Sequence, residues 1–228
     1  MKSSPNILVH SFHRTGSTML TYTLQKAYRA ILHGEAFNDA DRTSLIGDKD
    51  HEINLKLFES YSKNNDPFII KLMHWNFCQL NKDQRKKLLH ILDEYNFHII
   101  RLERKDVKEV IYSNYIARLT NEFQNQSKDP VVADKKQFSD VFNRAIKEYY
   151  WFIRNDPYIP YKQKIIYEDF IKNPKIKIGD KECVFNGFMK RSPPKKEKVL
   201  NYNEMESWYD ELYSNYVKES KENGKLYI

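Results

Sequence analysis

The chain is most constrained by residues 7–20, which have the sequence ILVHSFHRTGSTML. The apolar run ILV predicts a short buried strand, and the polar residues after it predict a tight turn. A helical pattern then begins at Met19 and Leu20. Because the first backbone N–H groups of a helix have no partners within it, a turn between a strand and a helix N-terminus is a ready-made anion site.

The residue types in the turn, HRTGST at positions 13–18, suit a phosphate or sulfate group. Gly16 allows a close approach of the backbone, Ser17 and Thr18 add hydroxyl donors, and Arg14 adds a fixed positive charge. We therefore expect a ligand that carries phosphate or sulfate at this turn. A structural helix cap with an incidental glycine is the alternative interpretation.

The turn lacks the residues that define three other phosphate loops. A Walker A loop has a lysine directly after its last glycine, whereas Ser17 follows Gly16 here. A dinucleotide-binding fingerprint needs three glycines, and the turn has only Gly16. A cysteine phosphatase would need a cysteine in the turn, and the nearest one is Cys78. The missing lysine counts against a nucleoside triphosphate as the ligand.

Strands and helices alternate along the rest of the chain. Further strands are predicted at 68–73, 97–102 and 164–167, and helices at 17–30, 52–62, 82–95, 107–122, 134–154 and 203–217. Such alternation implies parallel pairing with helices on both faces of the sheet. The expected fold class is α/β, a P-loop-like three-layer α/β/α sandwich with a central parallel sheet of about four to five strands.

Length and composition predict one domain over residues 1–228, with a Lys-rich irregular segment at 174–228. The net charge of +7 suits a polyanionic small ligand and a nucleic acid equally well. Two cysteines, Cys78 and Cys183, form no disulfide framework, and none of the seven histidines has metal-ligand spacing, so no metal is predicted. Without a signal peptide or a membrane-spanning apolar run, a cytoplasmic setting is expected.

A second anion-binding group is expected at the same edge of the sheet. The strand at 97–102 runs into Arg104, and ligands of parallel sheets bind at the carboxyl ends of the strands. Ser113 follows in the helix that Asp106 is expected to cap. An anion could bind between Arg104 and Ser113. The alternative is that Arg104 pairs locally with Asp106 or Glu109.

These two segments resemble those of the sulfotransferases that use 3′-phosphoadenosine 5′-phosphosulfate (PAPS). Arg14–Thr18 is similar to their 5′-phosphosulfate loop, [RK]-[ST]-G-[ST]-[ST] after the first strand, and Arg104 with Ser113 to their 3′-phosphate motif. The bacterial trehalose sulfotransferase-like group looks closest. Residues 34–37 and 71–75 resemble its G-E-x-F and K-L-M-W segments, and residues 167–170 resemble the Y-E-D-L segment found more widely in sulfotransferases.

The resemblance implies transfer of a sulfuryl group from PAPS to a hydroxyl of an acceptor, which leaves adenosine 3′,5′-bisphosphate and needs no metal. Arg14 and the N–H groups of Thr15–Thr18 would hold the 5′-phosphosulfate and stabilise charge on the leaving phosphate. Arg104 and Ser113 would hold the 3′-phosphate. Tyr167 would contact the adenine.

The acceptor hydroxyl needs a general base. Glu35 is the first choice, because the resembling group has its glutamate there. His74 is the rival, since it follows the strand at 68–73 and many sulfotransferases use a histidine near that place. His13, inside the turn, is expected to shape the loop or contact phosphate.

Two other functions stay open. One is a degenerate P-loop nucleotide kinase, which would need ATP and Mg²⁺. The other is a basic module that binds a polyanion or nucleic acid through residues 190–198, although a solvated tail or lid is the commoner explanation of such a run. Residues 34–66 and 121–133 are expected to line the acceptor site. Their composition permits a carbohydrate, another small polar molecule or a peptide tyrosine, and the oligomeric state is left open.

Overall fold

The computed structural model describes residues 5–38, 46–64, 66–120, 130–154, 159–184 and 195–222. Its elements are β1 Ile7–Ser11, α1 Ser17–Tyr28, β2 Ile31–Glu35, α2 His51–Lys63, β3 Phe68–Met73, α3 His74–Gln79, α4 Lys82–Glu94, β4 His98–Glu103, α5 Val107–Leu119, α6 Lys135–Arg154, β5 Gln163–Ile166, α7 Tyr167–Lys172, β6 Lys175–Ile178, β7 Lys181–Val184, α8 Lys195–Lys198 and α9 Tyr202–Glu222. The chain forms two compact units, of residues 1–105 with 157–188 and of residues 106–156 with 189–228. The single domain expected over 1–228 stays a prediction.

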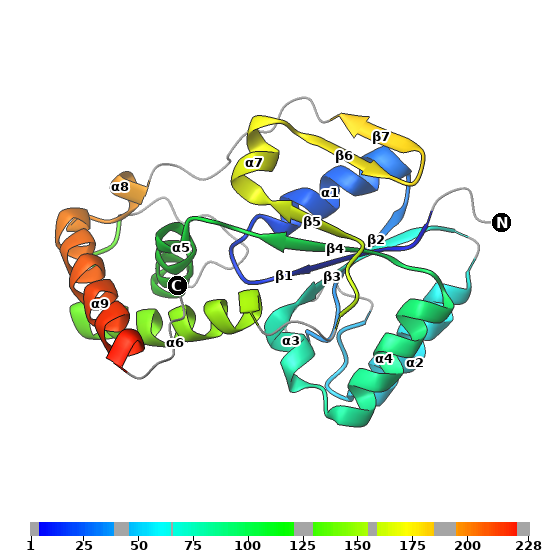
Figure 1. Cartoon of the computed structure of the whole chain (residues 1–228), viewed down its shortest axis with the longest axis horizontal. Helices are drawn as coiled ribbons and strands as arrows, with labels where there is room; N and C mark the ends of the chain where they lie inside the picture. The colour runs from blue at the N-terminus through cyan, green and yellow to red at the C-terminus, as the bar shows by residue number, and fades with distance from the viewer. Residues whose placement is uncertain are drawn as a thin grey trace. The chain divides into compact units, whose positions relative to one another are not determined.

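The first unit is built on a five-stranded parallel sheet of order β2-β3-β1-β4-β5 (Figure 1). In the central strand β1, Ile7 lies level with Ile69 of β3 and His98 of β4. β1 is buried along its whole length, as expected for a strand that is covered on both faces. The predicted α/β class with four to five parallel strands is confirmed.

Two apolar cores separate the sheet from the layers above and below it. Ile7 and Val9 enter the core shared with α1, α7 and the β6–β7 hairpin, while Leu8 enters the core shared with α2, α3 and α4. Alternate residues of a strand point to opposite faces, so one strand supplies both cores. Figure 1 shows the two helical layers on either side of the sheet, which is the predicted three-layer α/β/α arrangement.

The sequence does not predict β2, where its pattern indicates a helix end followed by a break. The helix predicted to Ala30 ends instead at Tyr28, because Arg29 adopts the left-handed conformation at φ 51°. Ile31 lies in the edge strand and is 48% exposed. Gly34 has a φ of 71°, and the pairing register of β2 with β3 shifts between Leu32 and Glu35. A short, bulged edge strand carries a weak sequence pattern.

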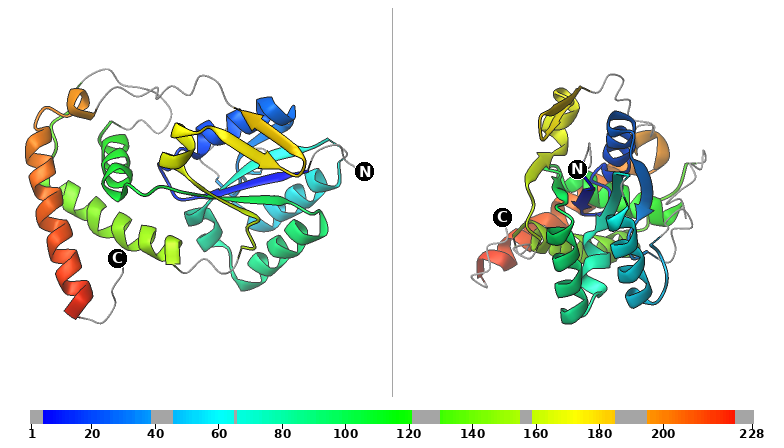
Figure 2. Two further views of the ribbon diagram at one scale, coloured as in Figure 1. Left: turned by 45° about the horizontal axis from the view of Figure 1, so that its top comes forward. Right: turned by 90° about the vertical axis from the view of Figure 1, so that its right-hand side faces the viewer.

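The segment at 174–228, expected to be irregular, is more regular than predicted. β6 and β7 form an antiparallel hairpin around Gly179, which has a φ of 59°. Ile176 and Ile178 of the sequence KIKI are buried, so the alternation of apolar and polar residues was the signal for a strand. The hairpin lies beside α1 (Figure 2), where Lys181 Nζ donates a hydrogen bond to the carbonyl of Ala27 at 2.7 Å.

The second unit is a helical cluster of α5, α6 and α9 around an aromatic core that includes Tyr112, Phe138 and Tyr209. Asp106 caps α5 as predicted, because its side chain accepts a hydrogen bond from the N–H of Glu109. Asn201 both accepts from the N–H of Ala133 at 2.7 Å and donates to its carbonyl at 3.0 Å. In the described ranges, no helix combines the length and the apolar character needed to cross a membrane.

His33 is a buried titratable group in β2. Its side chain is 2% exposed, its ring lies 4.4 Å from that of Tyr61 and 4.9 Å from that of Phe68, and its Nδ1 has no hydrogen-bond partner among the described residues. Burial lowers the pKa of His33 below its ordinary value of 6.5. The folded chain therefore favours the neutral imidazole.

We expect His33→Phe to flatten the pH dependence of stability in mild acid. As the pH falls below 6.5 the unfolded chain takes up the proton first, so stability that is present above that pH is lost below it. Urea unfolding at about pH 7.5 and about pH 5.5 should show a smaller loss for His33→Phe, which keeps the ring packing, than for the wild type. His98, whose pKa burial also lowers, accounts for part of the remaining loss. Equal losses in the two proteins would contradict the assignment.

Candidate functional site

The turn that joins β1 to α1 has a left-handed backbone at Arg14, with φ 62°, and at Gly16, with φ 87°. Left-handed residues within a turn let successive N–H groups converge on one point, the geometry of an anion-binding nest. The buried Thr15 holds the turn closed, because its hydroxyl donates to the carbonyl of Phe12 at 2.8 Å. The predicted strand–turn–helix arrangement is present.

The N-terminus of α1 is suited to an anion. Its N-cap residue is Gly16, no side chain caps it, and its first turn, which is fully described, contains no acidic residue. The positive end of the helix dipole therefore meets no neutralising carboxylate from the helix itself. This arrangement favours an anion site over a purely structural cap.

Tyr167, the first residue of α7, packs directly on Gly16. A Cβ added at Gly16 would lie 2.6 Å from Tyr167 Cδ2 and closer still to Cε2. A glycine is thus needed at position 16 for two structural reasons, its positive φ and the space taken by the Tyr167 ring. Both are separate from the close approach of an anion, which the sequence suggested. Tyr167 therefore lies at the turn, and its contact with an adenine stays a prediction.

Arg104 also reaches the turn. Its Nη1 donates to the carbonyl of Arg14 at 3.1 Å, its Nε lies 3.4 Å from Glu168 Oε1, and its guanidinium lies 4.9 Å from the centre of the Tyr167 ring. Burial lowers the pKa of Arg14, and the positive charge of Arg104 lowers it further. Because guanidinium groups repel one another, a bound anion would relieve the repulsion between Arg14 and Arg104.

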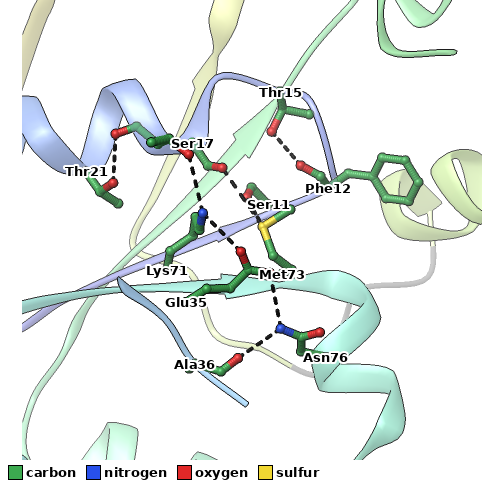
Figure 3. A network of polar contacts seen from close by, with 11 residues as sticks. Ser11, Phe12, Thr15, Ser17, Thr21, Glu35, Ala36, Lys71, Met73 and Asn76 are labelled. Atoms are coloured by element: carbon green, nitrogen blue, oxygen red, sulfur yellow. Dashed lines mark hydrogen bonds and ion pairs between the residues drawn. The ribbon is translucent and has the colours of Figure 1, made fainter. Parts of the chain in front are cut away.

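Lys71 of β3 connects the turn to Glu35 (Figure 3). Its Nζ donates to Thr18 Oγ1 at 3.3 Å and lies 3.1 Å from Glu35 Oε2. Asn76 donates to Glu35 Oε1 at 3.3 Å and to the carbonyl of Ala36 at 3.0 Å. The structure therefore brings the predicted base Glu35 to the anion turn and fixes both of its carboxylate oxygens.

Lys71 is a site residue that the sequence-based prediction missed. It lies in the K-L-M-W-like segment, yet it is absent from the predicted set. The signal was a single charged residue inside the apolar strand FIIKLM. A lysine in such a strand is costly unless a partner or a ligand compensates its charge, so its presence points to a role at the strand's end.

The two predicted hydroxyl donors of the turn face different groups. The hydroxyl of Thr18 accepts from Lys71, whereas that of Ser17 lies 3.9 Å from Met73 Sδ, with Ser11 Oγ at 3.5 Å from the same sulfur (Figure 3). A thioether is a weak acceptor, so the Ser17 hydroxyl can be redirected to a ligand at little cost.

His74, the rival base, is 4% exposed at the start of α3. Its Nε2 lies 3.4 Å from Cys78 Sγ, and its ring lies 5.7 Å from that of His10. Glu35, with 14% of its side chain exposed, is the more accessible of the two candidates. His13 packs edge-on against Phe12, with 5.6 Å between ring centres, which fits a role in shaping the loop.

Other predicted site residues lie elsewhere. Ser113 is a half-buried residue of α5 in the second unit, while Arg104 belongs to the first, so their joint binding of one anion stays a prediction. Residues 39–45, 65 and 121–129 of the expected acceptor segments, and 190–194 of the basic run, lie outside the described residues. Of the rest of that run, Lys195 Nζ lies 3.0 Å from Glu109 Oε2 and is therefore neutralised.

Gly16→Ala is expected to destabilise the protein by about 1–3 kcal/mol more than Gly179→Ala does. Both glycines have a positive φ, but at Gly179 no described heavy atom lies within 4 Å of the added Cβ, whereas at Gly16 that Cβ meets the Tyr167 ring. Gly179→Ala therefore measures the backbone strain alone, about 1–2 kcal/mol.

Chemical denaturation of the two variants gives the comparison. The double variant Gly16→Ala with Tyr167→Leu should recover part of the difference, because the smaller side chain can move away. If Gly16→Ala and Gly179→Ala cost the same, the contact between Gly16 and Tyr167 does not constrain the turn.

Comparisons with known proteins do not identify the function of the chain. No family model matches the chain, and no curated protein matches it. Among solved structures, the chain is similar to a protein from Chloroflexus aurantiacus described as "a putative kinase", with 12% identity, a TM-score of 0.39, and coverage of 62% of this chain and 80% of that one. A likeness at this level carries no functional argument. Within the described part of the chain, no cluster of three or more His, Cys, Asp or Glu side chains could hold a metal ion.

Proposed function

We propose that the chain is a sulfotransferase that moves a sulfuryl group from PAPS to a hydroxyl of an acceptor. One observation carries the proposal: Lys71 links Thr18 of the anion turn to the Glu35 carboxylate, at 3.3 Å and 3.1 Å. A cation and a candidate base thus stand beside an anion turn that lacks a Walker lysine. Sulfuryl transfer to a hydroxyl can use these three features together, for binding the donor, stabilising its charge and removing the acceptor proton.

The residues of the turn fit the 5′-phosphosulfate of PAPS. The uncapped N-terminus of α1 offers backbone donors, and Arg14 offers a half-buried guanidinium whose charge has no acid in the first turn of α1 to offset it. Tyr167 packs against the same turn and is the proposed contact for the adenine. When bound, PAPS would supply the sulfuryl group, and adenosine 3′,5′-bisphosphate would be the leaving group.

Each residue then has a defined task. Arg14 and the N–H groups of Thr15–Thr18 hold the anionic group and stabilise the charge that develops on the leaving phosphate. Lys71 offsets the negative charge of the transferred group. Glu35 takes the proton of the acceptor hydroxyl, and Asn76 keeps the carboxylate oriented for it.

The second half of the PAPS site rests on Arg104 and Ser113. Arg104 is held at the turn by the carbonyl of Arg14 and by Glu168, and its guanidinium is proposed to bind the 3′-phosphate. Ser113 of α5 is proposed as its partner. This pair would select PAPS over adenylyl sulfate, which has no 3′-phosphate.

A thermal-shift comparison separates this function from the alternatives. Adenosine 3′,5′-bisphosphate should raise the melting temperature more than ATP with Mg²⁺ or a short oligonucleotide at the same concentration, because only ligands that bind the folded state stabilise it. Stabilisation by ATP with Mg²⁺ and not by the bisphosphate would favour a kinase. Stabilisation by the oligonucleotide alone would favour a nucleic-acid-binding module.

A further inference from the structure

A thiol and an imidazole form a close pair on α3, the short helix that follows β3 (Figure 1). Cys78 and His74 are four residues apart, so they share one face of the helix. His74 Nε2 lies 3.4 Å from Cys78 Sγ. A thiol within hydrogen-bond reach of an imidazole can pass its proton to it, and the thiolate is the reactive form of a cysteine. The proposed sulfuryl transfer assigns no task to either side chain.

The imidazole of His74 is fixed in position by packing. Its side chain is 4% exposed, and its ring lies 5.7 Å from the ring of His10 in β1. His10 is 1% exposed, and its ring lies 6.0 Å from that of Phe77. A base that is held next to a nucleophile, and is itself oriented by a further group, has the geometry that activates the nucleophile.

Arg85 of α4 adds a positive charge at the same end of α3. Its Nη2 donates to the carbonyl of Cys78 at 2.7 Å, and its guanidinium carbon lies 5.3 Å from the centre of the Phe77 ring. The negative end of a helix disfavours a thiolate, and a cation on its last carbonyls offsets that effect. The buried Nε of Arg85 has no hydrogen-bond partner among the described residues. Arg85 and His10 are thus the charged or titratable groups that α4 and β1 bring to the pair.

The two cysteines of the chain differ in their surroundings. Both are free thiols, but Cys78 is half-buried, so that a small reagent can reach it. Cys183 is 7% exposed and belongs to the apolar core that contains Ile176 and Ile178. A thiol buried among apolar side chains is unreactive, whereas one beside cationic groups and partly open to solvent is reactive. Cys183 is therefore an internal reference for Cys78.

We propose that Cys78 is a modification site at which a hydroperoxide oxidises the thiol, with His74 as the base. His74 takes the thiol proton, and the thiolate attacks the distal oxygen of the peroxide. The S–O bond forms as the O–O bond breaks, and the leaving alkoxide or hydroxide takes the proton back from His74 to give an alcohol or water. The sulfur is oxidised by two electrons to a sulfenic acid, and the peroxide is reduced by two.

The sulfenic acid is then capped by a small thiol of the glutathione class. The sulfur of that thiol forms an S–S bond with Cys78, the S–O bond breaks, and water leaves. Exchange with a second small thiol restores Cys78, so the modification is reversible. This chemistry does not depend on the proposed sulfotransferase function, because it uses the reduced chain alone.

Trapping with dimedone locates the modified residue. The purified full chain is reduced, freed of reductant and exposed to hydrogen peroxide with dimedone, and the adduct is located by peptide mass spectrometry. We expect an adduct at Cys78 and none at Cys183 while the chain stays folded. Alkylation by iodoacetamide at about pH 7 should be faster at Cys78 than at the fully exposed thiol of glutathione, although Cys78 is half-buried.

His74→Gln tests the role of the base. It should slow alkylation of Cys78 at about pH 7 by about tenfold. His90→Gln, at an exposed histidine of α4, is the matched control and should leave the rate unchanged. The rates of the wild type and of His74→Gln should converge at about pH 9.5, where a thiol ionises without help. A change in access to Cys78 would instead alter the rate by the same factor at both pH values.

The same measurements can overturn the proposal. It is wrong if dimedone labels Cys183 as fast as Cys78, or if iodoacetamide alkylates Cys78 more slowly than glutathione. It is also wrong if the two histidine variants react equally, or if the effect of His74→Gln does not change with pH. If His74→Gln fails to fold, Arg85→Gln takes its place and should slow alkylation at about pH 7 by about threefold. An unchanged rate in that variant would contradict the proposal in the same way.

Discussion

Glu35→Gln is expected to lower kcat for sulfuryl transfer by about 10²–10⁴-fold, with the dissociation constant for adenosine 3′,5′-bisphosphate within about twofold of the wild type. The amide keeps the shape of the side chain and can still accept a hydrogen bond from Lys71, but it cannot take the proton of the acceptor hydroxyl. Steady-state release of the bisphosphate from PAPS gives kcat, and calorimetric titration gives the dissociation constant.

His74→Gln is the control for Glu35→Gln, because His74 is the other candidate for the general base. His74 is 4% exposed and contacts Cys78, so its replacement can affect stability, and the melting temperature must be measured alongside turnover. Most of the turnover per folded molecule should remain. If His74→Gln abolishes turnover while Glu35→Gln retains it, the base is His74 and the role proposed for Glu35 is wrong.

Arg14→Gly is expected to weaken binding of adenosine 3′,5′-bisphosphate by about 10–100-fold and to lower kcat/KM further, by about 10²–10³-fold. Arg14 supplies a charge-assisted contact to the bound anion, and that contact becomes stronger as charge develops on the leaving phosphate. Calorimetry of the bisphosphate and steady-state kinetics with PAPS measure the two effects separately.

The choice of glycine removes backbone strain from this comparison. Arg14 has a φ of 62°, which glycine adopts without cost and alanine does not, so Arg14→Ala should bind as poorly as Arg14→Gly and be less stable. Without ligand, Arg14→Gly should melt at or above the wild-type temperature, because a half-buried guanidinium beside the like charge of Arg104 has been removed. Binding of the bisphosphate by Arg14→Gly at wild-type affinity would mean that the turn does not hold the anion.

Local sequence patterns predict the parts of the fold whose burial is uniform. The runs that form β3 and β4 are buried on both faces of the sheet along most of their length, and Asp106 stands where a capping residue must stand. β2 and the β6–β7 hairpin are not predicted because an edge strand and a two-stranded hairpin are half exposed. Their few buried residues can be identified as strand residues only when the elements that they pack against are known.

The same distinction applies to the site. Arg14, Gly16 and Thr18 are predicted because the anion turn is a contiguous stretch of chain. The contact of Lys71 with Glu35 depends on the pairing of β2 with β3, where these two residues are level across the strands. The packing of Tyr167 on Gly16 likewise depends on where α7 begins relative to the turn. Strand order and register are properties of the folded chain that no local pattern encodes.

Sulfuryl transfer is tested most directly by incubating the purified protein with PAPS and a desalted metabolite extract, and by following the products with mass spectrometry. We expect a product that gains a sulfuryl group together with an equal amount of adenosine 3′,5′-bisphosphate, and no such product with Arg14→Gly. A phosphorylated product formed from ATP with Mg²⁺, with no sulfuryl transfer from PAPS, would contradict it.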